Sequence, residues 1–425
     1  MKLIQSLAAI TLISLPLYVV RCRDFSWCSA PTPFTLLEVF ILVTFFSWLI
    51  WRVYSVRNKI ISTQKLFEGL RGPFFWPLVI FLGIGTLSMF VSSDLRSAAG
   101  IWKAYFVEPA LLFIVVLDIS VIRKSIAWAL YSLLFSGFWV SSLAIWQSIT
   151  KIDPFASESI ISNRVTGVFD NPNALSLYLG PVSIIGLGFV FKIIRDKQSF
   201  NKKLLKLTLL IVGLLTFLFA IYLSKSRGAG IGLAASLVFF VGLILYTKLS
   251  VNLKKLGRRI FYLTVSVLLA FLAFGFLNID RFVPAKAPKP LNTAYTRLCI
   301  WQATNRMLDD KFVMGAGLSG FPLVYPQYAT CERHPFQYPH NIFLNFWVEM
   351  GVVGLLAFLW ITYIYSKALS KHLNNFLAIG LLSTLAYIFV HGLVDVPYFK
   401  NDLSSQFWVL LAIAVWFDKS KVESV

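Results

Sequence analysis

The chain has 425 residues, of which 58% are hydrophobic and only 14% charged, and its mean hydropathy is +0.75. Soluble domains carry about 25% charged residues, so this composition excludes a single water-soluble core and makes the lipid bilayer the main solvent. The net charge of +20 would suggest a nucleic-acid partner in a soluble protein. Because no basic stretch forms a soluble module here, we expect basic residues beside membrane helices, membrane lipids as partners and no nucleic acid.

Apolar runs of about 20 residues, long enough to cross a bilayer as helices, recur along the whole chain. They predict an all-α polytopic membrane protein with twelve transmembrane helices. The predicted spans are Leu3–Val20, Phe34–Val53, Phe74–Ser92, Gly100–Ile119, Ile122–Thr150, Pro172–Ile194, Leu204–Leu223, Gly228–Leu249, Ile260–Leu277, Ile342–Tyr365, Asn375–Val394 and Leu403–Phe417.

These spans divide the chain into residues 1–277 with nine helices, a long loop over residues 278–341, and residues 342–425 with three helices and a short tail. The first run follows Lys2 as in a signal peptide, but no small-residue cleavage site follows it. We therefore expect a retained helix.

Lys and Arg are distributed unevenly between alternate connecting segments. One set carries 23 of the 39, against eight on the short connections of the other side. Because cytoplasmic loops are enriched in Lys and Arg, both termini should face the cytoplasm of a bacterial inner membrane and the long loop the periplasm. All four cysteines then lie on the periplasmic side, where disulfides can form. Cys22 would pair with Cys28 and Cys299 with Cys331, or all four would remain thiols.

The long loop contains one helical pattern and one glycine-rich segment. From Asn292 to Asp309, the residues Leu298, Trp301 and Leu308 recur at helical spacing with Arg297, which predicts an amphipathic helix on the membrane surface. The segment 315–320 fits G-x-G-x-x-G. We reject a dinucleotide site, because that motif needs a strand–turn–helix unit in a soluble fold, and expect a turn that permits close backbone approach.

Two sets of polar residues could carry chemistry. His340 lies where the long loop enters the tenth predicted helix and Asn341 can cap that helix; the histidine is either a proton-transfer group or a satisfied interfacial side chain. Lys225 and Arg227 precede the eighth helix. A helix N-terminus and a guanidinium both favour phosphate, although an interfacial anchor is the alternative for Arg227.

Other polar groups are candidates on weaker grounds. His391 and Asp395 lie near the outer end of the eleventh predicted helix, and intramembrane carboxylates are functional candidates by default. Glu108 and Glu349 could simply be satisfied by neighbouring helices. We expect no metal, because a Cys/His cluster at ligand spacing is absent and the adjacent carboxylates Asp309 and Asp310 would point to different faces of a helix.

The segment that starts at His340-Asn341 continues with nine residues, Gly351, two residues and Gly354. This pattern resembles the signature of the O-antigen ligase family. Three further stretches also resemble the family: Ser224-Lys-Ser-Arg227-Gly, Arg297-Leu-Cys-Ile-Trp301 followed by Gly315-Ala-Gly317, and His391-Gly-Leu-Val-Asp395. The resemblance spans roughly residues 167–416. It does not separate lipopolysaccharide ligases from O-antigen polymerases or protein O-oligosaccharyltransferases.

The resemblance implies a C-type glycosyltransferase architecture and transfer of a glycan from undecaprenyl diphosphate to an acceptor hydroxyl, on lipid A–core in the ligases. By position, Arg227 and Arg297 would bind the diphosphate, and His340 would serve the acceptor. Lys225, Asn341, His391 and Asp395 join the expected substrate-binding set. The implied reaction is inverting and needs no metal, nucleotide sugar or other cofactor.

Two hypotheses from other functional classes remain as alternatives to an enzyme. A transporter or flippase for lipid-linked glycans would also need a basic cavity for phosphate, but it usually has internal repeats and broken helices near the midplane. We find no convincing repeat. A purely structural membrane subunit would give no reason for the set of arginines and histidines.

Overall fold

The computed structural model describes residues 1–21, 34–60, 72–152, 163–196, 200–250, 253, 293–329, 331 and 336–419. Within them the regular structure is helical, apart from an isolated bridge between Arg21 and Thr35. In chain order the helices are α1 (Lys2–Ile13), η1 (Leu15–Val19), α2 (Leu36–Arg57), α4 (Phe75–Val91), α5 (Leu95–Trp102), the π-helical turn η3 (Lys103–Val107), α6 (Glu108–Arg123), α7 (Ala127–Thr150), α8 (Pro172–Arg195), α9 (Phe200–Ser224), α10 (Arg227–Lys248), α13 (Thr293–Asp310), α14 (Phe321–Tyr328), α15 (Ile342–Ser370), α16 (Phe376–Gly392) and α17 (Asn401–Lys419).

Eleven of the twelve predicted spans coincide with helices. The remaining span, Ile260–Leu277, lies outside the described residues, as do Cys22, Cys28 and residues 278–292 of the long loop. The start of the predicted span Ile122–Thr150 is wrong by five residues, because α6 continues to Arg123 and α7 begins only at Ala127. Lys124 ends α6 in the left-handed conformation, so the chain turns there.

Seven of the described helices are long and apolar enough to cross a membrane, and α1, α4 and α16 are shorter apolar helices. α9 and α10 expose large apolar side chains along most of their length; Leu215 is 61% exposed and Ile231 63% exposed. In water such a surface would be strongly unfavourable, whereas lipid tails solvate it. The chain is therefore a polytopic membrane protein.

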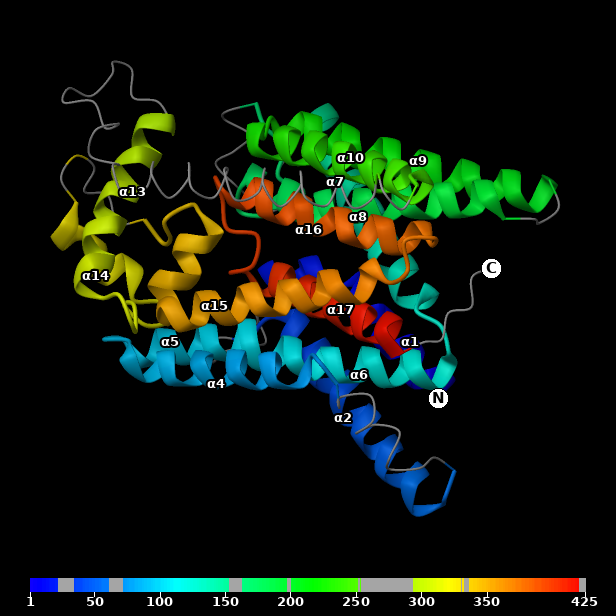
Figure 1. Ribbon diagram of the computed structural model, residues 1–425, viewed down its shortest axis with the longest axis horizontal. Helices are drawn as coiled ribbons and strands as arrows, with labels where there is room; N and C mark the ends of the chain where they lie inside the picture. The colour runs from blue at the N-terminus through cyan, green and yellow to red at the C-terminus, as the bar shows by residue number, and fades with distance from the viewer. Residues whose placement is uncertain are drawn as a thin grey trace.

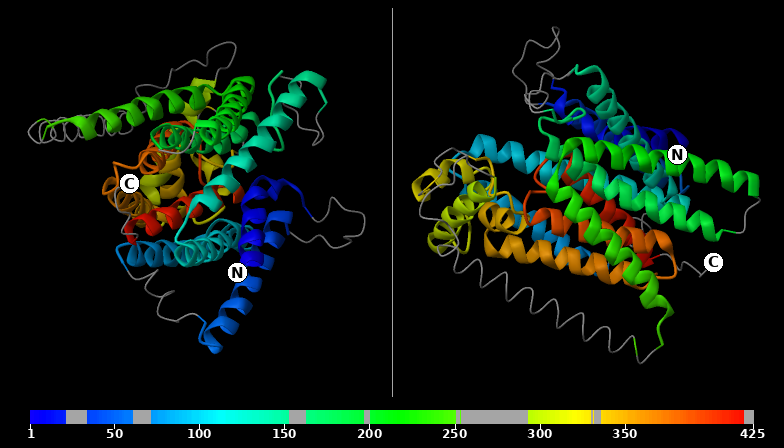
Figure 2. Two further views of the ribbon diagram at one scale, coloured as in Figure 1. Left: turned by 90° about the vertical axis from the view of Figure 1, so that its right-hand side faces the viewer. Right: turned by 90° about the horizontal axis from the view of Figure 1, so that it is seen from above.

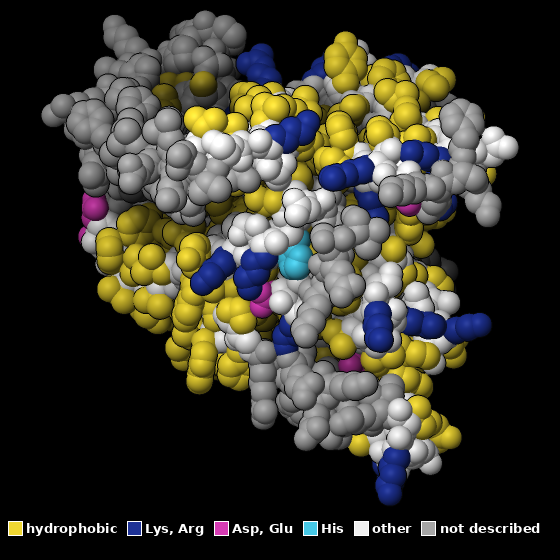
Figure 3. Space-filling view, turned by 45° about the vertical axis from the view of Figure 1, so that its right-hand side comes forward, with side chains coloured by type: hydrophobic (Ala, Val, Ile, Leu, Met, Phe, Trp, Pro, Cys, Tyr) yellow, Lys and Arg dark blue, Asp and Glu magenta, His cyan; other side chains and the backbone are white. Residues whose placement is uncertain are grey.

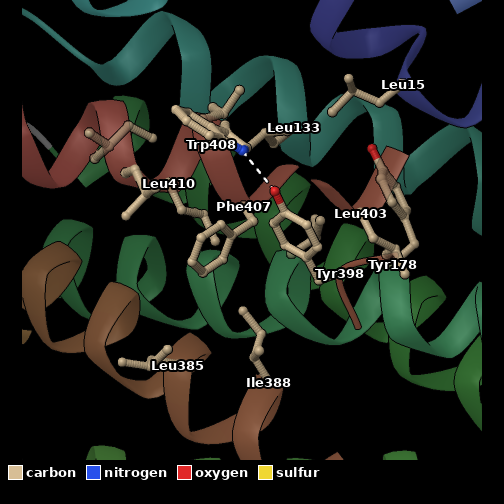
Figure 4. Packing of buried hydrophobic residues seen from close by; sticks show 14 of the residues in the cluster. Leu15, Leu133, Tyr178, Leu385, Ile388, Tyr398, Leu403, Phe407, Trp408 and Leu410 are labelled. Atoms are coloured by element: carbon tan, nitrogen blue, oxygen red, sulfur yellow. Dashed lines mark hydrogen bonds between the residues drawn. The ribbon is translucent and has the colours of Figure 1, made fainter. Parts of the chain in front are cut away.

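The helix α17 lies at the centre of the bundle. Nearly all of its side chains from Asp402 to Phe417 are buried, against α6, α15 and η1 among others. Figure 4 shows Trp408 donating from Nε1 to the Tyr398 hydroxyl at 3.1 Å, surrounded by apolar side chains from several helices. Because neighbouring helices shield α17 from lipid, it tolerates the polar run Ser404, Ser405 and Gln406.

The long helices lie side by side, and the molecule has two distinct ends (Figures 1 and 2). α13 and α14 lie together at one end, which we call the loop end. The start of α1 and the end of α17 lie at the opposite end, the terminal end. Figure 3 brings the terminal end forward and shows Lys and Arg side chains spread over it, with few acidic side chains between them. This arrangement agrees with the charge asymmetry along the sequence.

The loop end has a small core of its own. α13 packs on α14 and α15 through Ile300, Ala303 and Met307, which contact Phe321 and Tyr325 within one buried cluster. The predicted helix is confirmed, but its fully buried face contains Tyr295, Cys299, Ala303 and Met307, whereas Leu298 and Trp301 are only partly buried. The difference arises because α13 packs against protein. The predicted disulfide between Cys299 and Cys331 is present.

The glycine-rich segment fixes this small core to the bundle. Gly315 and Gly317 have φ of +68° and +81°, and a Cβ on either would overlap backbone atoms, of Trp347 and Val348 or of Ser92. The amide of Ala316 donates to the Val348 carbonyl at 2.7 Å, and that of Leu318 donates to the Ser88 carbonyl at 3.2 Å. The segment therefore serves close backbone approach, in agreement with the interpretation of its sequence.

Replacing Gly351 by Ala should destabilise the folded protein by more than about 2 kcal/mol. Gly351 interrupts α15 with φ of +69°, and a Cβ there would lie 1.8 Å from the Val313 carbonyl oxygen. With ψ of 179°, this backbone conformation lies in a region essentially confined to glycine and costs an alanine about 1–3 kcal/mol, and the overlap adds to it. Thermal unfolding in one detergent measures the effect. The matched control is Gly242→Ala in α10, where nothing lies within 4 Å; equal unfolding temperatures for the two variants would contradict this account.

Candidate functional site

His340 and Asp395 meet at the loop end of the bundle. His340 directly precedes the N-cap of α15, and Asp395 follows α16. The His340 Nδ1 atom lies 3.7 Å from Asp395 Oδ1, with the imidazole 29% exposed and the carboxylate side chain only 6% exposed. One face of the histidine is thus directed to a buried carboxylate, while part of the ring stays accessible. This arrangement is suited to a proton-transfer group that is held in place by an acid.

Asn341 fixes this pair by tying two helix ends together. Its Oδ1 accepts from the amides of Phe343 at 3.0 Å and Leu344 at 3.2 Å, which caps α15. Its Nδ2 donates to the Leu393 carbonyl at 3.1 Å, beside the end of α16. The predicted cap is confirmed. Because both ends of the amide are bound to backbone, Asn341 acts here on the position of its neighbour His340.

The backbone before His340 is also held firmly. Trp301 of α13 donates from Nε1 to the Pro339 carbonyl at 2.9 Å, and the Tyr338 ring packs edge-on against the His340 ring with centroids 5.0 Å apart. His340 itself has φ of +50°, an uncommon conformation for a residue with a side chain. These contacts hold the histidine at the edge of the loop-end core.

Asp395 is an ionised carboxylate in this arrangement. Burial alone raises its pKa, but the nearby His340, the charge of His391 and the Val396 amide outweigh burial, so the pKa of Asp395 lies below its ordinary value. The amide of Val396 donates to Oδ1 at 2.9 Å. A negative charge is therefore present beside both histidines at neutral pH.

The start of α10 lies against the end of α16. A Cβ on Gly228 would lie 2.9 Å from the Nε2 atom of His391, and one on Gly232 would lie 3.3 Å from the His391 Cβ. The two glycines therefore allow α10 to approach the histidine closely. Arg227 is the first residue of α10, and Ser226 caps the helix by accepting from the Ala229 amide. The chain thus brings Arg227 to the same end of the bundle as His391.

Tyr387 orients His391, a partner that the sequence analysis did not identify. The Tyr387 hydroxyl donates to the Ser176 carbonyl at 2.7 Å and lies 2.9 Å from His391 Nδ1. Because the single hydroxyl hydrogen is used by Ser176, Nδ1 is the donor to Tyr387, and Nε2 is left facing α10. The spacing of four residues on one helix is the signal that could have identified this pair.

Arg297 reaches the same region from α13. Its charge acts electrostatically on the His391 ring, and the side chain is partly buried. Among the described residues, no carboxylate lies within ion-pair distance of Arg227 or Arg297, whereas Lys400 pairs with Asp170 at 2.8 Å. Within the described part of the chain, these two permanently charged side chains have no carboxylate counter-ion, which favours an anionic ligand.

The structure places the remaining candidates apart from this group. Lys225 lies in the α9–α10 turn and faces a pocket beside α7. Glu349 accepts from the Ser319 amide at 2.6 Å and joins the glycine-rich segment to α15. Glu108 lies 3.8 Å from Lys103, which also pairs with Glu38 at 2.9 Å. Both glutamates thus have partners within the helix bundle.

Comparison with known proteins adds independent findings. Residues 212–359 match the family model described as O-antigen ligase. This range runs from α9 to α15 and contains Arg227, Arg297 and His340, but not His391 or Asp395.

Three provisionally named polysaccharide ligases from rickettsiae are similar to this chain. The protein of Rickettsia conorii is 26% identical over 66% of this chain and 71% of its own length. That of Rickettsia typhi is 26% identical over 67% of this chain and 77% of its own length. That of Rickettsia prowazekii is 24% identical over the same shares.

Proposed function

Because these matches assign the chain to the O-antigen ligase family, we propose that it transfers a glycan from undecaprenyl diphosphate to an acceptor hydroxyl at the periplasmic face of the inner membrane. The acceptor in this proposal is lipid A–core. The observation that carries the proposal is the meeting of His340 with buried Asp395 beside a region that also holds His391, Arg297 and the start of α10.

The two arginines would bind the diphosphate of the donor. Transfer breaks the bond between the anomeric carbon and the diphosphate oxygen, so negative charge develops on the leaving group. Guanidinium groups that already lie in place stabilise this charge most in the transition state. The free amides and partial positive charge at the start of α10 act in the same direction. The arginines would thus perform the neutralisation for which other transferases use a metal.

His340 would take the proton from the acceptor hydroxyl as its oxygen attacks the anomeric carbon. The exposed part of the imidazole faces the acceptor in this mechanism, and Asp395 stabilises the imidazolium that forms. The proton moves from the hydroxyl to the histidine, the glycosidic bond forms, and undecaprenyl diphosphate leaves. Because the displacement is direct, the anomeric configuration inverts.

The test uses purified full-length protein in vesicles with glycan-charged undecaprenyl diphosphate in the outer leaflet. Lipid A–core is added to one sample, and extra donor alone is added to another. Formation of glycan-bearing lipid A–core supports a ligase. Longer glycans on the lipid carrier without an acceptor would indicate a polymerase, glycan on an added protein acceptor an oligosaccharyltransferase, and movement of intact donor to the inner leaflet a flippase.

A further inference from the structure

A basic pocket lies at the loop end, on the side of the α9–α10 turn that faces α7. It has a volume of about 350 Å³ and is open to the surroundings. Its described lining contains the three cations Lys151, Arg164 and Lys225, together with Gln147, Asn163 and Tyr222, and no acidic residue among the residues that the structure describes. The group around His340 and Asp395 described above contains none of these residues, and Lys225 is two residues before Arg227, which starts α10.

The floor of this pocket is rigid. The Gln147 Oε1 accepts from the amides of Thr166 at 3.2 Å and Gly167 at 2.8 Å, and its Nε2 donates to the Gly167 carbonyl at 2.8 Å. These bonds fix the loop that carries Asn163 and Arg164 to α7. The same loop is fixed to α9, because Arg164 Nε donates to the Ser224 carbonyl at 2.7 Å. The pocket is therefore formed before any ligand arrives.

The three cations lack a counter-ion among the described residues. The Arg164 guanidinium donates to the backbone carbonyl of Ser224 and, from Nη2, to Asn173 Oδ1 at 3.0 Å. Neither acceptor is a carboxylate. No described acidic side chain lies within ion-pair distance of Lys151 or Lys225. Burial lowers the pKa of Arg164, which means that its charge is held in a poorly solvated position. Three like charges around one opening repel each other unless an anion lies between them.

The backbone around the opening has an uncommon conformation at three positions. Lys151, Asn163 and Lys225 all have positive φ, of +59°, +56° and +53°. Residues with side chains adopt this conformation infrequently, and such conformations persist where the surrounding structure imposes them. Here they occur at three separate turns that border the same pocket.

We infer that this pocket binds a phosphoryl group, held by Lys151, Arg164 and Lys225 and separate from the diphosphate set formed by Arg227 and Arg297. A phosphomonoester has three terminal oxygens and a charge of about −1.5 to −2 near neutral pH, so it can receive donors from three directions. A carboxylate has one charge and two oxygens in a plane, which a single guanidinium already satisfies.

The phosphoryl group could come from a phosphorylated sugar of the acceptor glycolipid or from the headgroup of an anionic phospholipid. The first source rests on the proposed function, since a transferase must hold its acceptor next to its donor. Lys225 and Arg227 are two residues apart, so their Cα atoms are separated by at most about 8 Å. An anion in the pocket would therefore lie beside the start of α10.

The experiment measures binding and requires no transfer activity, so it can fail or succeed independently of the proposed function. Full-length protein in a phosphate-free maltoside detergent is titrated calorimetrically with glucose 6-phosphate and, as a neutral control, with glucose. A second arm adds phosphatidylglycerol and counts retained lipid molecules by native mass spectrometry. Lys151→Gln, Lys225→Gln and the double variant are compared with the parent protein in both arms.

Each single substitution should weaken binding by about 10-fold and the double substitution by about 100-fold, because each removes one charge-assisted hydrogen bond. The matched control is Lys124→Gln, an exposed lysine with φ of +52° at the end of α6. It should bind like the parent. Unfolding temperatures of all variants should agree, because Lys151 and Lys225 are exposed.

If the substitutions weaken the binding of glucose 6-phosphate alone, the site is supported and its phosphoryl group comes from a sugar phosphate. If they weaken the binding of phosphatidylglycerol alone, the site is supported and its phosphoryl group comes from a phospholipid. Binding of both probes by the double variant at the parent's affinity overturns the inference. Binding of neither probe by the parent protein overturns it as well.

Discussion

Arg227→Ala and Arg297→Ala should each lower the rate of glycan transfer by about 10²–10³-fold, the usual effect of removing one preorganised donor from a developing negative charge. Neither guanidinium has a described carboxylate as partner, so removing it leaves no buried acid uncompensated. Because the interaction strengthens in the transition state, kcat should fall more than the KM of the donor rises. Initial rates with purified, reconstituted protein measure both quantities.

Two further variants separate a specific role from a general effect of charge. Arg96→Ala changes an exposed arginine in α5 at the loop end and should retain the parent rate. Arg297→Lys keeps a charge but loses the planar fork of donors, so it should recover only part of the activity. Near-parental transfer by both alanine variants of Arg227 and Arg297 would remove the basis of the proposed mechanism.

The arrangement of membrane helices was predictable from sequence because the length of apolar sequence needed to cross a bilayer determines it. A helix that crosses lipid must satisfy its backbone internally and present apolar side chains over a nearly fixed length. This constraint located even α17, whose polar residues Ser404, Ser405 and Gln406 lie among other helices. The faces of helices outside the bilayer were harder to predict. In α13, protein contacts from α14 and α15 decide which residues are buried, so Leu298 and Trp301 remain partly exposed.

The candidate site was predictable only as a set of separate residues. The sequence placed His340, Arg227, Arg297, His391 and Asp395 on one side of the membrane, but it contained no information on which of them touch. The contact between His340 and Asp395 depends on how Asn341 joins α15 to the end of α16. The pocket around Arg164 depends on how α7 packs against α9. Such contacts arise from tertiary packing, and no local pattern encodes them.

His340→Ala should lower transfer by about 10²–10⁴-fold if the imidazole accepts the proton of the acceptor hydroxyl. Asp395→Asn should have a smaller effect, because the base remains but the imidazolium loses its counter-ion at 3.7 Å. Because the imidazolium forms only during the reaction in this mechanism, the loss of rate in Asp395→Asn should appear at every pH at which the carboxylate of the parent protein is ionised. Initial rates of the parent protein and both variants across the pH range check this.

The direction of the Asp395 pKa shift indicates the pH range in which this carboxylate is charged. The pKa of Asp395 lies below its ordinary value, so the carboxylate stabilises the folded protein at neutral pH and loses this contribution only at strongly acidic pH. A change of rate between about pH 5 and 8 therefore does not report the titration of Asp395. His372→Ala at the terminal end is the matched control and should leave the rate and the pH profile unchanged. If His340→Ala retains residual transfer with the parental pH dependence, His340 positions the acceptor without accepting its proton.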